Sequence, residues 1–222
     1  MDAPARVEVL IDVVSDVVCP WCYLGKHRLE AAIAMVPEIA VEVRWRPFQL
    51  DASVPPGGMD RAEYIRRKFG DTGRIEPVHQ RLTEWGHTVG IDYHFERITR
   101  SPNTIDAHRL VRFVPEPQQN DAVEALFKAY FTDGRDVGDH AVLADIGSAF
   151  GLDRGGALAR LAGGQARAAV LAEIEEAYRI GVSGVPCFIL NQRYAVMGAE
   201  LPENIARAIR QAAAAGAAAN SR

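Results

Sequence analysis

Two cysteines, spaced two residues apart between a strand-like and a helix-like segment, constrain this chain more than any other feature. Cys19 and Cys22 follow an apolar, β-branched run at Val7–Val14 and open a segment of helical periodicity at Tyr23–Met35. Unpaired N–H groups and the positive end of the dipole at a helix N-terminus favour a thiolate over a thiol. A thiolate attacks disulfides, so this placement predicts a reactive Cys19, onto which Cys22 can close back. Pro20 suits the first helical turn, where a missing N–H costs nothing.

The same spacing is compatible with two other uses. Half of a zinc site would need two further ligands, but the sequence holds one other cysteine, Cys187, and its 6 histidines include no close pair. Two inert, buried cysteines are the other alternative, because free cysteine often packs as a small apolar side chain. Redox chemistry is the favoured interpretation, and we predict no metal site.

Length and composition exclude several classes of function. The 222 residues, 48% apolar and 24% charged, suit one domain with an insertion or two small domains. The net charge of −4 argues against a nucleic-acid partner, which would favour a basic face. No apolar run approaches the roughly 20 residues that cross a bilayer, and the N-terminus lacks a signal-peptide pattern. Because 3 cysteines are too few for a disulfide framework, we expect a cytoplasmic protein with no membrane association.

Hydrophobic periodicity predicts a βαβ unit at the start of the chain. Val7–Val14 and Ile39–Trp45 have strand patterns, and the helix between them ends near Pro37. Two strands joined in this way pair in parallel through a right-handed crossover. A stretch rich in proline and glycine at residues 54–58 then indicates a linker.

Helical periods fill residues 55 to 180, and strand patterns return after them. Apolar residues at i, i+3 and i+4 are more typical of core packing than of a ligand site. Strands are predicted at Cys187–Leu190 and Tyr194–Met197, joined by a hairpin, and a last helix at Leu201–Ala213 precedes an alanine-rich end that we expect to fray. The predicted stripes are Tyr64, Ile65 and Phe69; Val78, Leu82 and Trp85; Ala107, Leu110, Val111 and Val114; Val123, Leu126, Phe127 and Tyr130; Val142, Leu143, Ile146 and Phe150; and Val170, Ile174, Ala177 and Tyr178.

This order of elements is that of an α/β thioredoxin fold with a large helical insertion. We predict a thioredoxin-like domain from residues 1–54 and 180–222, and a helical insertion domain at 55–179. Thioredoxin-like proteins place a cis-proline at the start of the third strand, facing the cysteines, and Val185-Pro186 stands at that position. Cis X–Pro bonds are a minority in folded proteins, so the position relative to the cysteines carries this prediction.

Three segments, in the right order and spread over nearly the whole chain, carry a resemblance to a known family. The chain resembles the DsbA-like thioredoxin group, and most closely its FrnE-type branch of cytoplasmic thiol–disulfide oxidoreductases. The segments are Ser15-Asp16-Val17-Val18-Cys19-Pro20-Trp21-Cys22-Tyr23-Leu24-Gly25, Asn103-Thr104-Ile105-Asp106-Ala107-His108-Arg109-Leu110 and Gly181-Val182-Ser183-Gly184-Val185-Pro186-Cys187-Phe188.

The resemblance implies a role for each matching position. Cys19 is expected to be the exposed nucleophile, Cys22 the buried resolving thiol and Pro186 the cis-proline. The backbone of Val185 would pair with an extended substrate, a peptide or glutathione, by β-type hydrogen bonds. Pro20-Trp21 would tune the redox potential. No bound cofactor is implied, glutathione would be a redox partner or co-substrate, and the protein would be a monomer or a homodimer.

Two alternatives to the oxidoreductase remain. The glutathione-dependent 2-hydroxychromene-2-carboxylate isomerases and kappa-class transferases share this architecture but carry a serine where this chain has Cys19. Gly198-Ala199-Glu200 also departs from the segment that holds glutathione in those enzymes, although a helix N-terminus near residues 198–202 could still bind it weakly. The other alternative is a non-catalytic thioredoxin-like binding module with vestigial cysteines.

Other polar or reactive side chains have simpler interpretations. Cys187 is expected to be a buried apolar filler, turned away from Pro186 by strand alternation. His27 lies roughly 80° around the helix from the first cysteine and is expected at the surface. Asp12 or Asp16 could accept a proton from the second cysteine, although Asp16 is equally typical of a cap or a turn.

Overall fold

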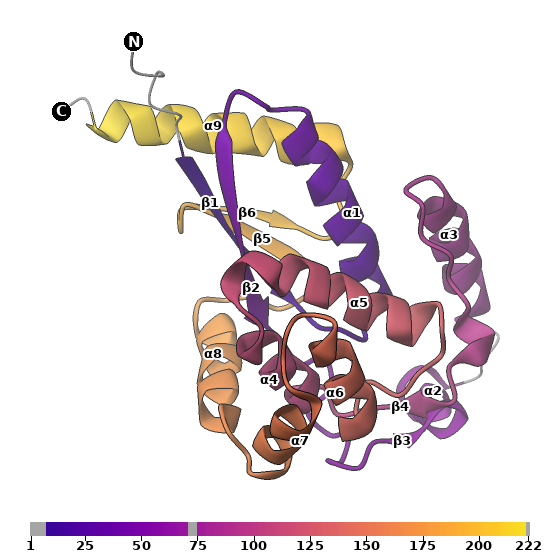
Figure 1. Ribbon diagram of the computed structural model, residues 1–222. Helices are drawn as coiled ribbons and strands as arrows, with labels where there is room; N and C mark the ends of the chain where they lie inside the picture. The colour runs from indigo at the N-terminus through magenta and orange to yellow at the C-terminus, as the bar shows by residue number, and fades with distance from the viewer. Residues whose placement is uncertain (1–7, 71–74, 221–222) are drawn as a thin grey trace.

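A four-stranded sheet lies at the centre of the fold, in a computed structural model that describes residues 8–70 and 75–220 (Figure 1). Its strand order is β2 (Ala40–Pro47), β1 (Glu8–Ser15), β5 (Cys187–Leu190) and β6 (Tyr194–Met197). β1 and β2 pair in parallel, whereas β5 is antiparallel to both β1 and β6. The predicted parallel pair and late hairpin are therefore confirmed; Val7, predicted to begin the first strand, lies outside the described residues.

Helices account for most of the rest of the described chain. They are α1 (Pro20–Ala34), α2 (Arg61–Phe69), α3 (Glu76–His87), α4 (Ile105–Phe113), α5 (Gln119–Phe131), α6 (His140–Ser148), α7 (Arg154–Ala162), α8 (Arg167–Arg179) and α9 (Pro202–Asn220). Short 3-10 turns lie at η2 (Phe95–Arg97) and η3 (Glu116–Gln118), and a small second sheet pairs β3 (Met59–Asp60) with β4 (Arg100–Ser101). None of the helices in these two ranges is long and apolar enough to cross a membrane.

β1 is a central strand whose two faces are both covered. On one face Val9, Ile11 and Val13 pack in a cluster that includes side chains of α1 and α9. On the other face Val14 packs in a cluster with Ala177 of α8. Figure 1 shows α1 and α9 side by side over the first face. Full burial of an aliphatic side chain contributes about 1.5–3 kcal/mol, which explains a β-branched run with little alternation.

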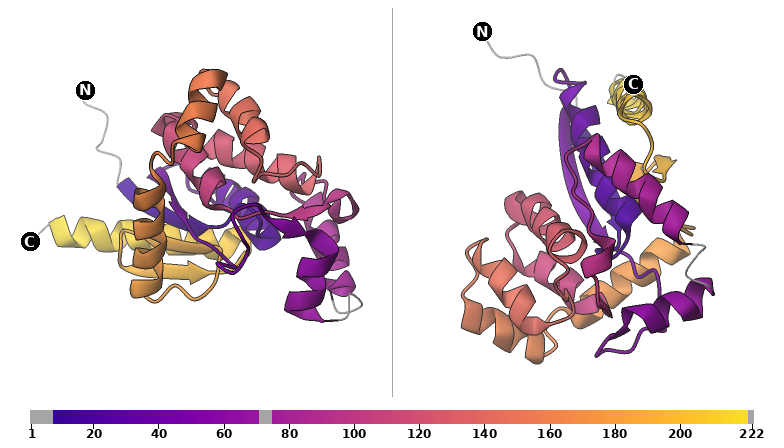
Figure 2. Two further views of the ribbon diagram at one scale, coloured as in Figure 1. Left: turned by 90° about the horizontal axis from the view of Figure 1, so that it is seen from below. Right: turned by 90° about the vertical axis from the view of Figure 1, so that its right-hand side faces the viewer.

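The helical block gathers beside the end of the sheet at which β1 runs into α1 (Figure 2). Helix α5 packs against α1 and β2, and α8 packs against β2 and α4. One large apolar cluster therefore contains both Cys19 and Cys22 as well as Leu126 and Phe127 of α5. Since α8 contacts both the sheet and the helical block, the division of the chain into domains at residues 54 and 180 stays a prediction.

Several sequence-based predictions need correction. The stripe on α3 is only partly buried, because that helix packs mainly against α1: Leu82 is inaccessible, but Val78 and Trp85 are 40% and 37% exposed. The last helix continues to Asn220 instead of ending at Ala213, since alanine is the best helix former. The patterns also fail to indicate α7, whose first turn contains two glycines and is capped by the side chain of Asp153.

A buried arginine ties α4 to the end of α7. Arg109 is 1% exposed, and its guanidinium donates hydrogen bonds to the carbonyls of Arg160 (2.7 Å), Leu161 (3.0 Å) and Gln165 (2.6 Å). Its charge is balanced by Asp106 at 2.6 Å. These contacts satisfy carbonyls that the end of a helix leaves without partners, which makes the buried charge tolerable.

Replacing Arg109 by alanine should lower the free energy of unfolding by about 3–5 kcal/mol, because the change leaves buried carbonyls and a carboxylate unpaired. Urea unfolding followed by circular dichroism measures this loss. Arg112→Ala is the matched control, because Arg112 lies on the same helix and is 41% exposed in its ion pair with Glu173. Arg112→Ala should lower the free energy of unfolding by less than about 1 kcal/mol. Equal losses for the two variants would contradict a structural role of the buried cluster around Arg109.

Candidate active site around Cys19 and Cys22

Cys19 is the N-cap residue of α1, at the point where the chain leaves β1. Its backbone is extended (φ −92°, ψ 111°), and its carbonyl accepts hydrogen bonds from the N–H groups of Cys22 (3.0 Å) and Tyr23 (3.3 Å). The N–H of Cys19 donates to the carbonyl of Asp16 at 3.0 Å, which closes the turn after the strand. Cys19 thus stands at the positive end of the helix, as its position in the sequence predicts.

Both thiols are free and buried: Cys19 is 3% exposed and Cys22 1%. The expectation of an exposed Cys19 is therefore wrong for this conformation. Its Sγ lies 3.7 Å from the carbonyl oxygen of Val185, and the apolar cluster that surrounds it includes Val185. Pro20 and Trp21, between the cysteines, are only half-buried and form the nearby surface.

The loop before β5 brings Pro186 against α1. The Val185–Pro186 peptide bond is cis. At Gly25, one turn beyond Cys22, a Cβ atom would lie 2.8 Å from Cγ of Pro186, so only glycine permits this approach. The fold thus brings together all six residues singled out from the sequence: Cys19, Pro20, Trp21, Cys22, Val185 and Pro186.

Burial raises the pKa of Cys22 well above its ordinary value, and the hydrogen bond and charge of Cys19 add to that effect. The side chain of Ser15 and the main chain of Asp16 act in the opposite direction on the same sulfur. Cys22 therefore keeps its proton at neutral pH. The two neighbouring sulfurs therefore have different environments. Disulfide exchange through a mixed disulfide requires this difference, because one thiol attacks the substrate and the other resolves the intermediate.

Three aromatic and cationic side chains beside the pair were not indicated by the sequence. The hydroxyl of Tyr93 donates to the carbonyl of Pro20 at 2.6 Å. The rings of Trp21 and Trp85 meet edge-on at 5.7 Å, and the guanidinium of Arg28 lies 5.3 Å from the Trp85 ring centre. Trp85 belongs to a predicted helical stripe, so the sequence indicates a core position for it. Tyr93 lies between helices, where no sequence pattern marks it as part of a site.

A buried ion cluster holds α1 against α5. Lys26, whose side chain is 3% exposed, pairs with Glu30 at 2.6 Å and with Glu124 at 2.8 Å. Glu124 also accepts a hydrogen bond from Tyr23 at 2.9 Å and lies 3.2 Å from Nε2 of His27. The expectation of a surface His27 is wrong, because α5 packs over this face of the helix and leaves the side chain 20% exposed.

The ion cluster shifts the pKa values of Glu124 and His27. Burial alone would raise the pKa of Glu124, but the hydrogen bond of His27 and the charge of Lys26 outweigh it and lower the pKa to about 2. Burial alone would lower the pKa of His27, but the hydrogen bond and charge of Glu124 outweigh it and raise that pKa. Both shifts favour the charged pair.

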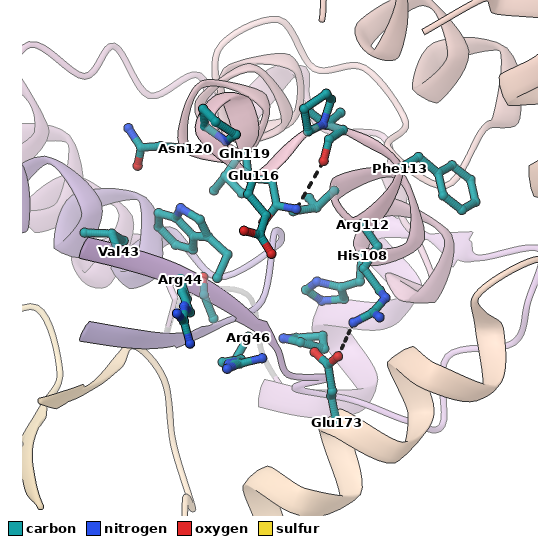
Figure 3. A pocket seen from close by; sticks show the side chains of 18 of the residues that line it. Val43, Arg44, Arg46, His108, Arg112, Phe113, Glu116, Gln119, Asn120 and Glu173 are labelled. Carbon is teal, nitrogen blue, oxygen red and sulfur yellow. Dashed lines mark hydrogen bonds and ion pairs between the residues drawn. The ribbon is translucent and has the colours of Figure 1, made fainter. Parts of the chain in front are cut away.

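A pocket of about 860 Å³ lies next to the free edge of β2 (Figure 3). Its walls are β2, the end of α4, η3 and the start of α5, and Ser15 and Val17 contribute from the segment before Cys19. Figure 3 shows His108 and the ion pair of Arg112 with Glu173 in this wall. Over residues 8–70 and 75–220, no three His, Cys, Asp or Glu side chains are grouped to hold a metal ion.

A Cys-x-x-Cys pair at the head of the first helix, opposite a cis-proline at the start of an antiparallel strand, defines a thioredoxin-like protein. The chain belongs to the family of the DSBA-like thioredoxin domain, whose model matches residues 10–210.

Known proteins agree with this family. A probable DsbA oxidoreductase from Streptomyces coelicolor superposes with a TM-score of 0.84 at 30% identity, covering 92% of this chain and 89% of that one. A 2-hydroxychromene-2-carboxylate isomerase (TM-score 0.69, 19% identity, 91% and 97% covered) and the cytosolic disulfide reductase DsbM from Pseudomonas aeruginosa with GSH (0.62, 20%, 91% and 98%) share the fold. The uncharacterized protein YwbO of Bacillus subtilis is 30% identical over 146 residues, 65% of this chain and 68% of that protein.

Glu124→Gln should remove a pH-dependent part of the stability. Because the pKa of Glu124 is lowered by folding from 4.5 to about 2, its contribution is present above pH 4.5 and is lost as the pH falls toward 2. Because the pKa of His27 is raised above 6.5, its contribution is present below pH 6.5 and is lost at higher pH. Between these limits the variant should be less stable by about 2 kcal/mol, after allowance for partial solvent screening.

Urea unfolding at a series of pH values gives this difference directly, and it should shrink on both sides of the window. Glu42→Gln is the control, since Glu42 is 59% exposed in its pair with Arg44 and should change stability by less than about 0.5 kcal/mol at every pH. A pH-independent loss in Glu124→Gln would show that the residue acts by packing alone.

Proposed function

We propose that this protein is a thiol–disulfide oxidoreductase that works through Cys19-Pro20-Trp21-Cys22. The observation that carries the proposal is the unequal pair of sulfurs at the N-terminus of α1. Cys19 stands at the positive end of the helix, whereas burial raises the pKa of Cys22 and keeps it a thiol. The family of the DSBA-like thioredoxin domain supports the reaction class.

The reaction takes two exchanges. The Cys19 thiolate attacks one sulfur of a substrate disulfide, the substrate S–S bond breaks, and the first substrate thiolate leaves with the bonding electron pair. Cys22 loses its proton and attacks Cys19 in the resulting mixed disulfide, which releases the second thiolate and leaves a Cys19–Cys22 disulfide. The reverse sequence oxidises a dithiol. No bound cofactor is required, because the two sulfurs carry both electrons.

The loop that faces the cysteines provides the substrate contact. The carbonyl of Val185 points at Cys19 at 3.7 Å, so an extended peptide or glutathione that pairs with this backbone would bring its sulfur to the thiol. Pro20 and Trp21 border the same surface and would tune the potential. We place the protein in the FrnE-type branch and in the cytoplasm, where glutathione would be its redox partner, and we assign the helical block at 55–179 to shaping the substrate cleft.

A glutathione-dependent isomerase or transferase is the alternative that the shared fold of the 2-hydroxychromene-2-carboxylate isomerase supports. Against it stand the two cysteines and Gly198-Ala199-Glu200, which depart from the pattern of those enzymes. Such an enzyme would use glutathione as the thiol and would have no need of Cys22. Thiol reactivity distinguishes the oxidoreductase from a non-catalytic binding module. In such a module neither cysteine would react faster than a model thiol near neutral pH.

Replacing Cys22 by serine should trap the substrate on Cys19, because the resolving thiol is gone. We expect a mixed disulfide with glutathione or with protein partners that survives non-reducing electrophoresis and is identified by mass spectrometry. Cys187→Ser is the matched control: Cys187 is buried away from the pair, among Val14, Phe48 and Val182, and the variant should turn over disulfides normally.

Three outcomes decide between the functions. Disulfide exchange that is lost in Cys22→Ser and retained in Cys187→Ser supports the oxidoreductase. Glutathione-dependent isomerisation or transfer that survives Cys22→Ser would favour the alternative enzyme. Alkylation of Cys19 in the native protein that is no faster than that of a model thiol would reject the oxidoreductase.

A further inference from the structure

Helix α3 places an exposed aromatic side chain next to the residues between the two cysteines. The rings of Trp21 and Trp85 meet edge-on at 5.7 Å, and Trp21 directly precedes Cys22. Trp85 is 37% exposed, although it belongs to a stripe with the spacing of a core helix. Figure 1 shows α3 beside α1, against which it mainly packs. The helical block therefore extends the apolar surface that the half-buried Trp21 begins.

The end of α3 and the loop that follows it are fixed to α1. Nδ1 of His27 lies 2.9 Å from the carbonyl oxygen of Val89. The hydroxyl of Tyr93 donates to the carbonyl of Pro20 at 2.6 Å. A Cβ atom at Gly86 would lie 2.7 Å from the Tyr93 ring, so the last turn of α3 packs directly on that ring. These contacts hold the end of α3 in a defined position beside the cysteine pair.

Two arginines lie close to the Trp85 ring and have no ion-pair partner in the part of the chain that the structure describes. The guanidinium of Arg28 lies 5.3 Å from the ring centre, and that of Arg81, which is exposed on α3, lies 5.9 Å from it. The charges of Glu200 and Glu203 act on Arg28 from beyond contact distance, which leaves Arg81 as the more available cation. A guanidinium beside a ring keeps its N–H donors, so this surface can bind a carboxylate.

The loop after β6 connects this surface to the cis-proline. Arg28 donates a hydrogen bond to the carbonyl of Ala199, and the N–H of Gly198 donates to the carbonyl of Pro186 at 2.8 Å. The surface thus runs from α3 across α1 to the loop that faces Cys19. We call it the aromatic rim and define it by Trp21, Arg28, Arg81 and Trp85.

We propose that the aromatic rim selects peptide disulfides in which an acidic and an aromatic residue flank the cysteine. This inference rests on the proposed function. A peptide that pairs with Val185 and is attacked by Cys19 has the residues beside its own cysteine next to Trp21. An aromatic side chain at that position packs on the two tryptophan rings, and a neighbouring carboxylate binds Arg81. Trp85 and Arg81 are specificity-determining residues, and the exchange itself is left to the cysteines.

Four peptide disulfides separate the effect of the ring from that of the charge. Each is the symmetric dimer of an acetylated tripeptide amide, with glutamate or glutamine before the cysteine and phenylalanine or alanine after it. Reduced protein is mixed with excess disulfide and quenched with acid, and mass spectrometry gives the second-order rate constant of exchange. The unaltered protein should prefer the peptide with glutamate and phenylalanine over the one with glutamine and alanine by about tenfold.

Two variants should each remove one preference. Trp85→Ala should lower the ratio of the rate constants for phenylalanine and alanine peptides about threefold to tenfold, whereas Trp85→Phe, which keeps a ring, should retain most of it. Arg81→Gln should bring the ratio for glutamate and glutamine peptides close to that of a model thiol. High salt should do the same to the unaltered protein, because it screens an exposed charge.

Val78→Ala and Arg193→Gln are the matched controls and should keep both preferences. Val78 is a 40% exposed apolar residue on the same helix, and Arg193 is an exposed cation in the hairpin at the opposite end of β5 from Pro186. A phenylalanine preference that survives in Trp85→Ala, or a glutamate preference that survives in Arg81→Gln, would overturn the proposal. Equal rate constants for the four peptides in the unaltered protein would overturn it as well. Exchange with all four that is no faster than with a model thiol would instead reject the proposed function.

Discussion

The contact between the first two turns of α1 and the loop before β5 is the constraint on which the rest of the structure depends. Gly25 is the position that makes it possible, because any side chain there would overlap Pro186. The contact brings the carbonyl of Val185 to Cys19 and closes the pair off from solvent. The sheet positions both partners: β1 leads into Cys19, and β5, hydrogen-bonded to β1, begins directly after Pro186.

The part of the site that is local in sequence could be predicted from it. The strand–helix junction places Cys19 at the N-cap independently of the rest of the chain. Strand alternation turns the side chain of Cys187 away from that of Pro186, into a separate buried cluster. The exposure of Cys19 could not be predicted in this way. It depends on how closely Val185 and the helical block pack over the junction, and these segments are far away in the chain.

The same distinction explains the other errors. His27 lies on a face of α1 that would be solvated in an isolated thioredoxin unit, but α5 covers it and supplies Glu124. The stripe on α3 has the spacing of a core helix, yet its neighbours cover one side only, so Trp85 reaches the surface beside Trp21. Periodicity identifies which residues share a face, whereas the packing of distant elements decides how much of that face is buried.

The burial of both thiols has a chemical consequence. A deeply buried Cys22 is protected from solvent and holds its proton, which keeps this second thiol unreactive until a substrate is bonded to Cys19. The same burial would block the resolving step unless the proton had a route that the bound substrate does not obstruct. The resolving step therefore needs a proton acceptor that reaches Cys22 while the substrate is bonded to Cys19.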